Sequence, residues 1–425
     1  MAPSRTLAVA AVLALSTVGL AACGGDDDDA GGTVSMELWE NATTGPGKAF
    51  WEKAAADFQA AHPNVKIKIQ AVQNEDLDGK LQTALNSGAA PDIFLQRGGG
   101  KMAAMVEAGQ LKDITADISA ETRQAVPEAA LKTGQIDGKA YAVPVAILPG
   151  GFWYSKELFQ KAGVTPPTTL DELTSAASKL KANGTPIALG AKDAWPAAHW
   201  YYFFALRACS QATLEAAAKS KTFDDPCWTK AGADLKAFAD TKPFNEGFLT
   251  TSAQQGAGSS AGLVANHKAS MELMGAWNPG VIASLTKDTK PLPDLGFFPF
   301  PAVPGGQGDP AAVMGGADGY SCSAQAPKEC ADFLNYILTK DVQEAYYRGF
   351  NALPVNKAAQ GAVTEDYLKA VLDAYNKAPY VSQWLDTVYG QNVGNALNVS
   401  IVDLLAGKGD VAAIIKAVTD AAKKG

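Results

Sequence analysis

The first third of the chain alternates between strand-like and helix-like hydrophobic patterns. In residues 65–72, VKIKIQAV, apolar and polar positions alternate, which predicts a strand with one buried face. Phe50, Ala54 and Phe58 recur at four-residue spacing, as the buried face of a helix does. The other segments are predicted as strands at 33–40 and 91–96 and as helices at 74–88 and 101–111. This order predicts α/β units built on a mostly parallel sheet.

The same alternation returns later in the chain. We predict helices at 152–163, 169–184 and 330–349, a strand at 185–190, and two C-terminal helices broken at 407–409. Prolines at positions 299, 301 and 304 exclude a helix there, so residues 298–306 are predicted to cross between two parts of the molecule. Self-similarity at a fixed period of roughly 20–50 residues is not evident, which argues against a solenoid.

The N-terminus has the pattern of an export signal. Arg5 precedes an apolar segment at 7–20 that is too short to span a bilayer of ~30 Å comfortably. It ends in Leu-Ala-Ala-Cys, which resembles the bacterial lipobox and predicts lipidation of Cys23; the alternative is ordinary cleavage with Cys23 incidental. We therefore expect a signal peptide at 1–22. A flexible tether follows at 23–32, where glycines and four aspartates keep the chain solvated.

Composition narrows the possible partners. The 425 residues are 47% hydrophobic and 19% charged, which is enough for a sizeable core. The net charge of −8 disfavours nucleic acid and anionic lipid head groups as partners. The three histidines lie far apart, so we predict no metal site and no cofactor.

Four further cysteines remain after Cys23, an even number in an exported protein. Proximity favours disulfides pairing Cys209 with Cys227 and Cys322 with Cys330, although four cysteines allow three connectivities and buried free thiols are the alternative. No CxxC motif is present, which argues against a zinc ribbon or a thioredoxin-like site.

Motifs for catalysis are weak, whereas aromatic residues in loops are frequent. The segment TTGPGKAF fails the P-loop pattern and no GxSxG elbow occurs, so we expect the protein not to be an enzyme. Several tryptophans lie at predicted element ends beside Gly, Pro or polar residues, as in DAWPAAHWYYFF, MGAWNPG and SQWLDTVYG. Aromatic planes can cover the apolar face of a sugar ring while polar side chains bind its hydroxyls. The alternative is that each tryptophan belongs to a core.

Together these segments resemble the bacterial extracellular solute-binding proteins of carbohydrate ABC importers, in the group of maltose-, xylobiose- and chitobiose-type binders. The resemblance runs over residues 33–425. It rests on PDIFLQRGGGKMAAMVEAGQLKDIT, GKAYAVPVAILPGGFWYSKELFQKAGV, PIALGAKDAWPAAHWYYFFALRAC, SMELMGAWNPG, GGADGYSCSAQAP and GQNVGNALNVSIVDLLAGKG, in this order behind a lipobox.

The resemblance implies a periplasmic-binding-protein type II fold: two α/β lobes with a hinge and an interlobe ligand cleft. We place lobe 1 at 33–143 plus 299–340 and lobe 2 at 144–298 plus 341–425. The crossings are then expected near Val143-Pro144, at 299–304 and near Lys340.

The resemblance also implies where ligand contacts lie. From lobe 1 we expect Glu40, Asn41, Gln73, Asn74, Gln96 and Arg97, which follow predicted strands. From lobe 2 we expect Trp195, His199, Trp200 and Trp277, with Trp277 the main stacking residue. Asp318 and Tyr320 lie at a Gly-rich turn, and Asn351 and Trp384 complete the set. Arg97 departs from the family pattern; it would bind vicinal hydroxyls or form a structural ion pair, for instance with Asp318.

The function implied is capture of a mono- or oligosaccharide and its delivery to ABC importer permease subunits. We expect a monomer held at the outer face of the cell membrane by its lipid alone. One alternative is a binder of another solute with the same fold, such as a polyamine, for which Glu40, Asp318 and Trp277 would serve, or iron. The others are an extracellular hydrolase and a structural or adhesive lipoprotein.

Overall fold

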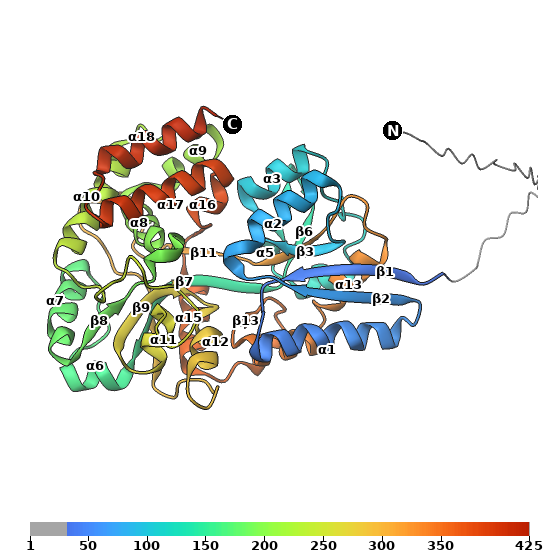
Figure 1. Cartoon of the computed structure of the whole chain (residues 1–425), viewed down its shortest axis with the longest axis horizontal. Coiled ribbons are helices and arrows are strands. Elements are labelled where there is room, and N and C mark those ends of the chain that lie inside the picture. Colours follow the sequence, from blue (N-terminus) through green and yellow to red (C-terminus); the bar gives the residue numbers. More distant parts are fainter. Residues whose placement is uncertain (1–31, 425) are drawn as a thin grey trace, which may run out of the picture.

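The computed structural model describes residues 32–424, which form two lobes, each built on its own β-sheet (Figure 1). Cys23 and the predicted signal peptide and tether up to residue 31 lie outside the described residues. Within residues 32–424, none of the helices combines the length and the apolarity needed to cross a bilayer.

Lobe 1 contains a five-stranded sheet in the order β2-β1-β3-β12-β6. Its strands are β1 (Val34–Glu40), β2 (Val65–Ala71), β3 (Ile93–Gln96), β6 (Ala142–Pro144) and β12 (Gly319–Cys322). β1, β2 and β3 are mutually parallel, whereas β12 runs antiparallel to both β3 and β6. The parallel half confirms the alternation predicted for the first third of the chain.

Helices and a small hairpin complete lobe 1. The helices are α1 (Gly45–Ala61), α2 (Asn74–Ser87), α3 (Gly99–Glu107), α4 (Ala120–Ala125), α5 (Glu128–Lys132), α13 (Glu329–Tyr336) and α14 (Lys340–Phe350), and the hairpin is β4 (Gln135–Ile136) with β5 (Lys139–Ala140). As the spacing predicted, Phe50, Ala54 and Phe58 form the buried face of α1. Leu77, Leu81 and Leu85 do the same for α2, which ends at Gly88 in the left-handed conformation.

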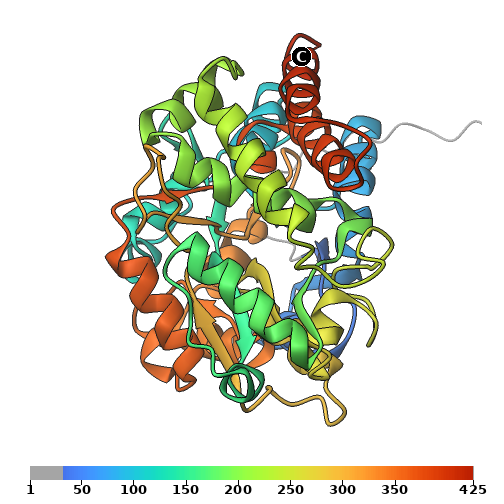
Figure 2. The same cartoon turned by 90° about the vertical axis from the view of Figure 1, so that its left-hand side faces the viewer.

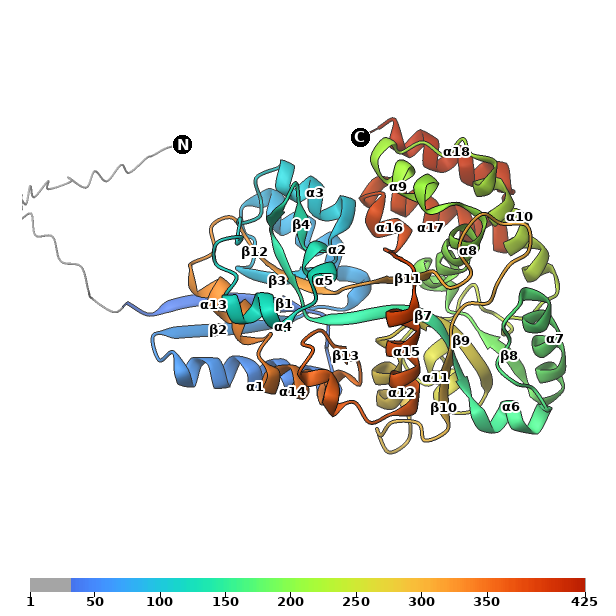
Figure 3. The same cartoon turned by 180° about the vertical axis from the view of Figure 1, so that it is seen from behind.

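Lobe 2 is centred on the long strand β7 (Ala146–Ser155), which runs from the junction with lobe 1 into the heart of lobe 2 (Figure 3). β7 pairs antiparallel with β9 (Ala269–Gly275), β10 (Leu295–Phe298), β11 (Val313–Gly316) and β13 (Leu353–Pro354). The parallel pairs are β8 (Thr185–Ala188) with β9 and β14 (Val381–Ser382) with β11. The prediction of a mostly parallel sheet is therefore wrong for this lobe.

The helices of lobe 2 lie around this sheet and cover it when that lobe faces the viewer (Figure 2). They are α6 (Lys156–Ala162), α7 (Leu170–Leu180), α8 (Trp195–Ala208), α9 (Gln211–Ser220), α10 (Pro226–Asp240), α11 (Ser260–Ala265), α12 (Asn278–Leu285), α15 (Asp366–Lys377), α16 (Leu385–Val388), α17 (Gln391–Leu405) and α18 (Val411–Ala422). Short 3₁₀ turns lie at Lys181–Asn183, Ala191–Asp193 and Ala359–Ala362. The break between α17 and α18 falls where the glycines at 407–409 predicted it.

The chain first changes sheet between Pro144 of β6 and Ala146 of β7. It returns between Gly316 of β11 and Gly319 of β12, and not at 299–304. The proline segment stays with lobe 2 because the Arg207 guanidinium donates hydrogen bonds to the carbonyl oxygens of Phe300 and Pro301.

The third crossing follows α14 instead of preceding it. The rings of Tyr346 and Phe350 on α14 lie edge-on to Phe50 of α1, with centroids 5.4 and 5.7 Å apart, which fixes α14 to lobe 1. β13 then pairs with β7 in lobe 2. We therefore propose lobe 1 as 32–144 plus 317–350 and lobe 2 as 145–316 plus 351–424, in place of the boundaries expected from the sequence.

The structure also joins the cysteines as expected from their proximity. Cys209 at the end of α8 is bonded to Cys227 in the first turn of α10, and Cys322 of β12 is bonded to Cys330 of α13. Each disulfide lies within one lobe, so neither restrains one lobe against the other.

Candidate functional site

Polar side chains gather where the parallel strands of lobe 1 end, at the edge that faces lobe 2. Glu40 ends β1 and Asn41 follows it, Asn74 opens α2 after β2, and Arg97 follows β3. The Asn41 amide donates a hydrogen bond of 3.3 Å to Asn74 Oδ1, which also accepts from Arg97 at 2.6 Å. The structure thus brings these predicted residues together, as expected for the carboxyl ends of parallel strands.

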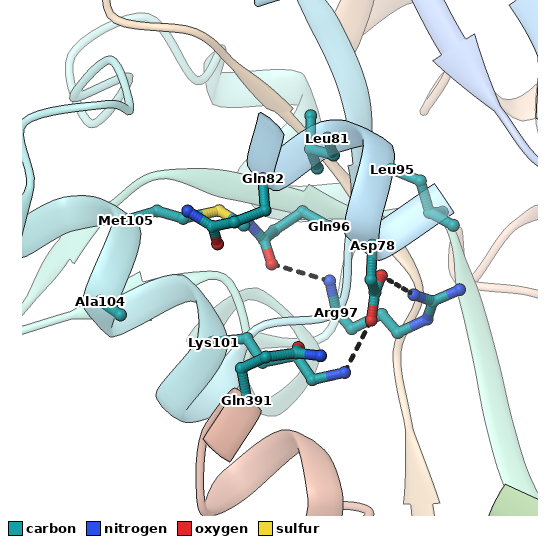
Figure 4. A pocket seen from close by; sticks show the side chains of 10 residues that line it. All are labelled: Asp78, Leu81, Gln82, Leu95, Gln96, Arg97, Lys101, Ala104, Met105 and Gln391. Atoms are coloured by element: carbon teal, nitrogen blue, oxygen red, sulfur yellow. Dashed lines mark hydrogen bonds and ion pairs between the residues drawn. The ribbon is translucent and has the colours of Figure 1, made fainter. Parts of the chain in front are cut away.

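Arg97 is held by a carboxylate that the sequence analysis did not single out (Figure 4). Its Nη1 lies 2.7 Å from Asp78 Oδ1, and Lys101 Nζ lies 2.7 Å from Asp78 Oδ2. Asp318, the partner considered from the sequence, is 3.9 Å from Arg97 Nε. Burial favours the protonated form of Asp78, but the two cations outweigh it and lower the pKa of Asp78 to about 2. Asp78 therefore stays ionised and fixes the orientation of Arg97.

Glu40 is the most buried of the candidate acids. Its side chain has no exposed surface; Oε2 accepts a hydrogen bond from the Ala42 N–H, and Oε1 has no partner within the described residues. Burial raises the pKa of Glu40 to about 7. A buried acceptor without a partner is costly, so Oε1 is suited to a donor from a bound molecule.

Lobe 2 contributes an aromatic cluster, which we define as Trp195, His199, Trp277 and Trp384. The His199 ring stacks on Trp384 with centroids 4.1 Å apart and planes 16° apart. Trp277 lies edge-on to both Trp384, at 5.7 Å, and Trp195, at 6.1 Å. Three separate parts of the sequence therefore form one aromatic cluster, in which Trp195 and Trp277 are partly exposed and His199 and Trp384 are buried. Partly exposed rings of this kind can stack on a sugar.

Backbone and burial both shape this aromatic cluster. Any side chain at Gly150 of β7 would place its Cβ 2.6 Å from the Trp384 ring, so glycine is needed for that ring to lie over the strand. Burial lowers the pKa of His199 to about 3, which keeps its imidazole neutral at pH 7. Trp277 packs against both hydrophobic clusters of the molecule, one of which continues from lobe 1 into lobe 2.

Two predicted ligand residues belong to the protein core instead. Trp200 has no exposed surface and stacks on Phe238 at 5.1 Å, because on helix α8 it faces away from Trp195 and His199. Tyr320 is 2% exposed and packs on Trp51 at 4.7 Å. Neither ring offers a surface to a solute in this arrangement.

The remaining predicted residues support the backbone. Gln96 accepts hydrogen bonds from the N–H groups of Arg97 and Gly98, at 2.9 and 3.2 Å. Asn351 ends α14 and donates to the Tyr367 hydroxyl at 2.7 Å. Gln73 is exposed and donates to the Thr43 hydroxyl at 3.1 Å. These contacts orient the loops around the junction.

Sequence reasoning missed Asp78 and Lys101, and it also missed a second buried carboxyl. Glu272 of β9 is 1% exposed and accepts a hydrogen bond of 2.8 Å from the Asn278 amide, next to Trp277. Burial raises the pKa of Glu272 to about 7. Acidic residues are frequent in this chain, so the sequence alone does not single these out. They are distinguished by their contacts with residues of other elements, which spacing along the sequence does not reveal.

The lobes are closed against each other beside Arg97. A cavity of about 60 Å³ lies there; lobe 1 supplies Asp78, Leu81, Gln82, Leu95, Gln96, Arg97, Lys101, Ala104 and Met105, and lobe 2 supplies Gln391 (Figure 4). Ligand pockets usually measure ~300–1,000 Å³. This cavity is therefore too small for a sugar. A solute would bind here only if the lobes separated, and otherwise it would bind farther along the junction, towards the aromatic cluster.

Known proteins share the sequence and the architecture of this chain. An extracellular-binding protein of an ABC transporter from Pyrococcus horikoshii is 28% identical over 334 residues, which are 76% of this chain and 72% of the relative. The diacetylchitobiose-binding protein DasA of Streptomyces coelicolor is 24% identical over 423 residues, 95% of each chain. A solved chitin oligosaccharide-binding protein superposes with a TM-score of 0.82 and 26% identity, over 92% of this chain and 98% of that one.

The family comparison agrees with these individual similarities. Residues 41–344 match the model of the bacterial extracellular solute-binding proteins, and this range contains β2, β3, β6 and β12 of lobe 1 and β7 to β11 of lobe 2. The paired lobes, the crossings at 144–146 and 316–319 and the polar strand ends at their junction are the features that this match spans. The chain belongs to the bacterial extracellular solute-binding protein family.

Proposed function

We propose that this protein is the substrate-binding subunit of an ABC importer and that its substrate is a sugar or short oligosaccharide held between the two lobes. The observation that carries the proposal is that lobe 2 holds an aromatic cluster and lobe 1 a set of polar strand ends at the edge that faces lobe 2. The names of similar proteins support it, since DasA is a diacetylchitobiose-binding protein and the superposed structure is a chitin oligosaccharide-binding protein.

The chemistry of the two walls is complementary to a sugar ring. Trp277, which is partly exposed, offers a plane for the apolar C–H face of the ring. Asn41, Asn74 and Arg97 offer donors and acceptors for its hydroxyls, and Asp78 keeps Arg97 oriented for that purpose. A wrong epimer would leave one of these groups unpaired at a cost of roughly 1–3 kcal/mol, which provides specificity.

Binding would stabilise the closed arrangement, because the sugar contacts both lobes only when they are together. The importer permease would then bind the outer surface of the closed protein, and the sugar would leave unchanged. Catalysis has no place in this cycle, so we expect no turnover of any bound oligosaccharide.

Attachment to the membrane belongs to the same proposal. Lipidation of Cys23 would hold the protein at the outer face of the cell membrane, with residues 24–32 as the tether. Two acyl chains anchor a protein stably, whereas one does so only marginally. Labelling cells with a fatty-acid analogue, with Cys23→Ser as the control, tests this part independently of sugar binding.

A thermal-shift panel tests the function. Residues 32–425 contain both sheets and are mixed with millimolar xylose, glucose and N-acetylglucosamine oligomers, raffinose, spermidine, iron and phosphate. A ligand at 100 times its Kd adds about 2.7 kcal/mol, which raises Tm by a few degrees. We expect the shift to be confined to one sugar series. A response to spermidine, iron or phosphate with none to any sugar would contradict the proposal, and product analysis of the same mixtures would expose a hydrolase.

Trp277→Ala tests the site. Loss of a stacking ring should weaken sugar binding by about 1–3 kcal/mol, roughly five- to 150-fold in Kd, measured by titration calorimetry. The matched control is Tyr336→Ala, which removes another half-buried aromatic ring, from α13 in lobe 1. Unchanged affinity in Trp277→Ala, with the control also unchanged, would place the sugar away from the aromatic cluster.

A further inference from the structure

The N-terminus of α3 in lobe 1 contacts the corner between α16 and α17 in lobe 2. Figures 1 and 3 show α3 and α16 facing each other across the junction, and their backbones are in contact. α3 opens with the run Gly98-Gly99-Gly100. We define the corner as residues 387–390. The glycine run and the corner lie far apart in the sequence and in different lobes, so they are in contact only while the lobes are together.

The contact depends on the absence of a side chain at position 100. A Cβ built on Gly100 would lie 2.6 Å from the carbonyl oxygen of Val388 and 2.8 Å from the amide nitrogen of Gly390. Real Cβ atoms essentially never approach backbone atoms so closely, so one lobe would have to move away. Gly100 lies inside α3 and has no positive φ, so alanine fits the helix itself and obstructs only the other lobe.

Charge crosses the same boundary. Burial lowers the pKa of the Arg97 guanidinium, but Asp78 and Asp318, together with Asp386 from α16 in lobe 2, outweigh burial and raise it. Arg97 comes just before the glycine run and Asp386 just before the corner. Attraction between them therefore favours the arrangement in which the glycine run and the corner touch.

A second contact joins the lobes elsewhere on the rim. Gln255, in the loop before α11 of lobe 2, donates a hydrogen bond of 3.2 Å to Glu75 in the first turn of α2 in lobe 1. Both side chains are exposed, so neither is needed for the core of its own lobe. This hydrogen bond adds a contact between the lobes on the rim, besides the one at the glycine run.

We propose that the packing of Gly100 against residues 387–390, assisted by the Gln255–Glu75 hydrogen bond, is a latch that populates the closed state before any sugar binds. The apparent affinity of a protein equals its intrinsic affinity reduced by the fraction of molecules in the binding-competent state. The latch therefore sets the affinity of the site without touching the ligand. Its effect on affinity rests on the proposed function, whereas its effect on the shape of the free protein does not.

Small-angle scattering of the sugar-free protein tests the latch. A compact chain of this length has a radius of gyration of roughly 21 Å. Gly100→Ala should give a larger radius than the wild type, because the methyl group excludes the closed contact. Gly79→Ala is the matched control: it adds the same methyl group to an exposed helical glycine of lobe 1, where no atom lies within 4 Å. Equal radii for wild type and Gly100→Ala would overturn the proposal.

Crosslinking gives a second measurement. Gln82 of lobe 1 and Gln391 of lobe 2 line the same small cavity (Figure 4). The cysteines at 209, 227, 322 and 330 are in disulfides, so Gln82→Cys with Gln391→Cys supplies the only free thiols among the described residues. A short bis-maleimide should link them without sugar, and Gly100→Ala should lower the yield severalfold. A yield that Gly100→Ala leaves unchanged would overturn the latch.

Glu75→Ala serves where Gly100→Ala fails to fold. It removes an exposed side chain and should change the radius and the crosslinking yield in the same direction by a smaller amount; no change in either would overturn the latch.

Titration with diacetylchitobiose then separates the two proposals. Weaker binding together with a larger radius supports both. If Gly100→Ala has a larger radius but neither it nor the wild type binds any sugar of the panel, the latch is retained and the proposed function is removed.

Discussion

At the scale of single residues, two buried carboxyl groups distinguish this protein. Glu40 and Glu272 each have at most 1% of their surface exposed, and burial raises the pKa of each to about 7. Each also keeps one oxygen without a hydrogen-bond partner within the described residues. Both groups therefore bind a proton in the folded state at a pH where an unfolded chain has lost it.

Glu272 should make stability depend on pH. Its pKa rises from 4.5 in the unfolded chain to about 7 in the folded one, so the folded state binds the extra proton between these values. Stability is therefore lost as the pH rises from about 4.5 through 7, by up to ~3 kcal/mol. Glu272→Gln has no proton to lose. We expect urea unfolding to show that the free energy of unfolding of the variant increases relative to that of the wild type between pH 5 and pH 8.

The control for this prediction is Glu246→Gln, which removes a carboxylate from an exposed position of the same lobe. Its unfolding free energy should follow that of the wild type across the same range of pH. A difference between Glu272→Gln and wild type that stays constant from pH 5 to pH 8 would show that Glu272 does not titrate there.

At the scale of elements, the end of α14 depends on one asparagine. Asn351 has a φ of 48°, in the left-handed region, and donates a buried hydrogen bond of 2.7 Å to Tyr367. Asn351→Ala should cost about 2–3 kcal/mol, from the strained backbone and the unpaired hydroxyl. Asn351→Gly loses only the hydrogen bond and should cost about 1 kcal/mol. Urea unfolding of both variants checks the order, and equal losses would show that the backbone conformation contributes nothing.

The disulfides should differ in what they contribute. Cys209 and Cys227 close a loop with a sequence separation of 18, whereas Cys322 and Cys330 are 8 apart. The loss of loop entropy in the unfolded chain predicts roughly 3 kcal/mol for the first and roughly 2.5 kcal/mol for the second. We expect Cys209→Ala with Cys227→Ala to lower the urea midpoint slightly more than Cys322→Ala with Cys330→Ala. The reverse order would indicate that native packing, and not chain entropy, decides.

The sequence predicted elements well where one face of each is buried. β2 and α1 each have one such face, so their hydrophobic periods are clear. Residues 152–155 belong to strand β7 and not to a helix, because β7 is buried on both faces and shows no period. Residues 330–349 form two helices, α13 and α14, since the chain turns at 337–339 and Thr339 precedes the second. The amphipathic pattern of the sequence continues through this turn and conceals it.

The site was predictable to the same extent. Residues at strand ends, such as Asn41 and Asn74, follow from topology alone. Trp195 and Trp200 could not be told apart, because their burial depends on which face of α8 meets the core. Asp78 could not be found because its role arises from an ion pair with Arg97, 19 residues away on another element.

At the scale of the whole molecule, the two lobes are separate bodies joined by three crossings. The crossings lie at 144–146, at 316–319 and after Phe350. Hydrogen bonds between the lobes gather beside the third crossing, where Val355, Asn356 and Thr364 bond to residues 338–347 of lobe 1. The described contacts on the rim are polar or made by glycines. Such an interface allows hinge motion of one lobe against the other.

Saturating sugar should therefore lower the radius of gyration of Gly100→Ala more than that of the wild type. The variant starts from a more open ensemble, and the same closed complex is the end point for both. Scattering in the presence and absence of the sugar identified by the thermal-shift panel measures the change. Equal decreases in the two proteins would mean that they share one starting ensemble.

The described chain also begins in one lobe and ends in the other. β1 starts at the end of lobe 1 that is far from the junction, and α18 ends on lobe 2 (Figure 1). The two ends are therefore carried by different bodies. A donor and an acceptor fluorophore fused before Val34 and after α18 would change their separation at each closure. Because the two ends lie on different lobes, such a fusion would report binding of the solute as a change in emission ratio. The residue at position 100 would set the ratio of the free protein, since it changes the population of the closed state.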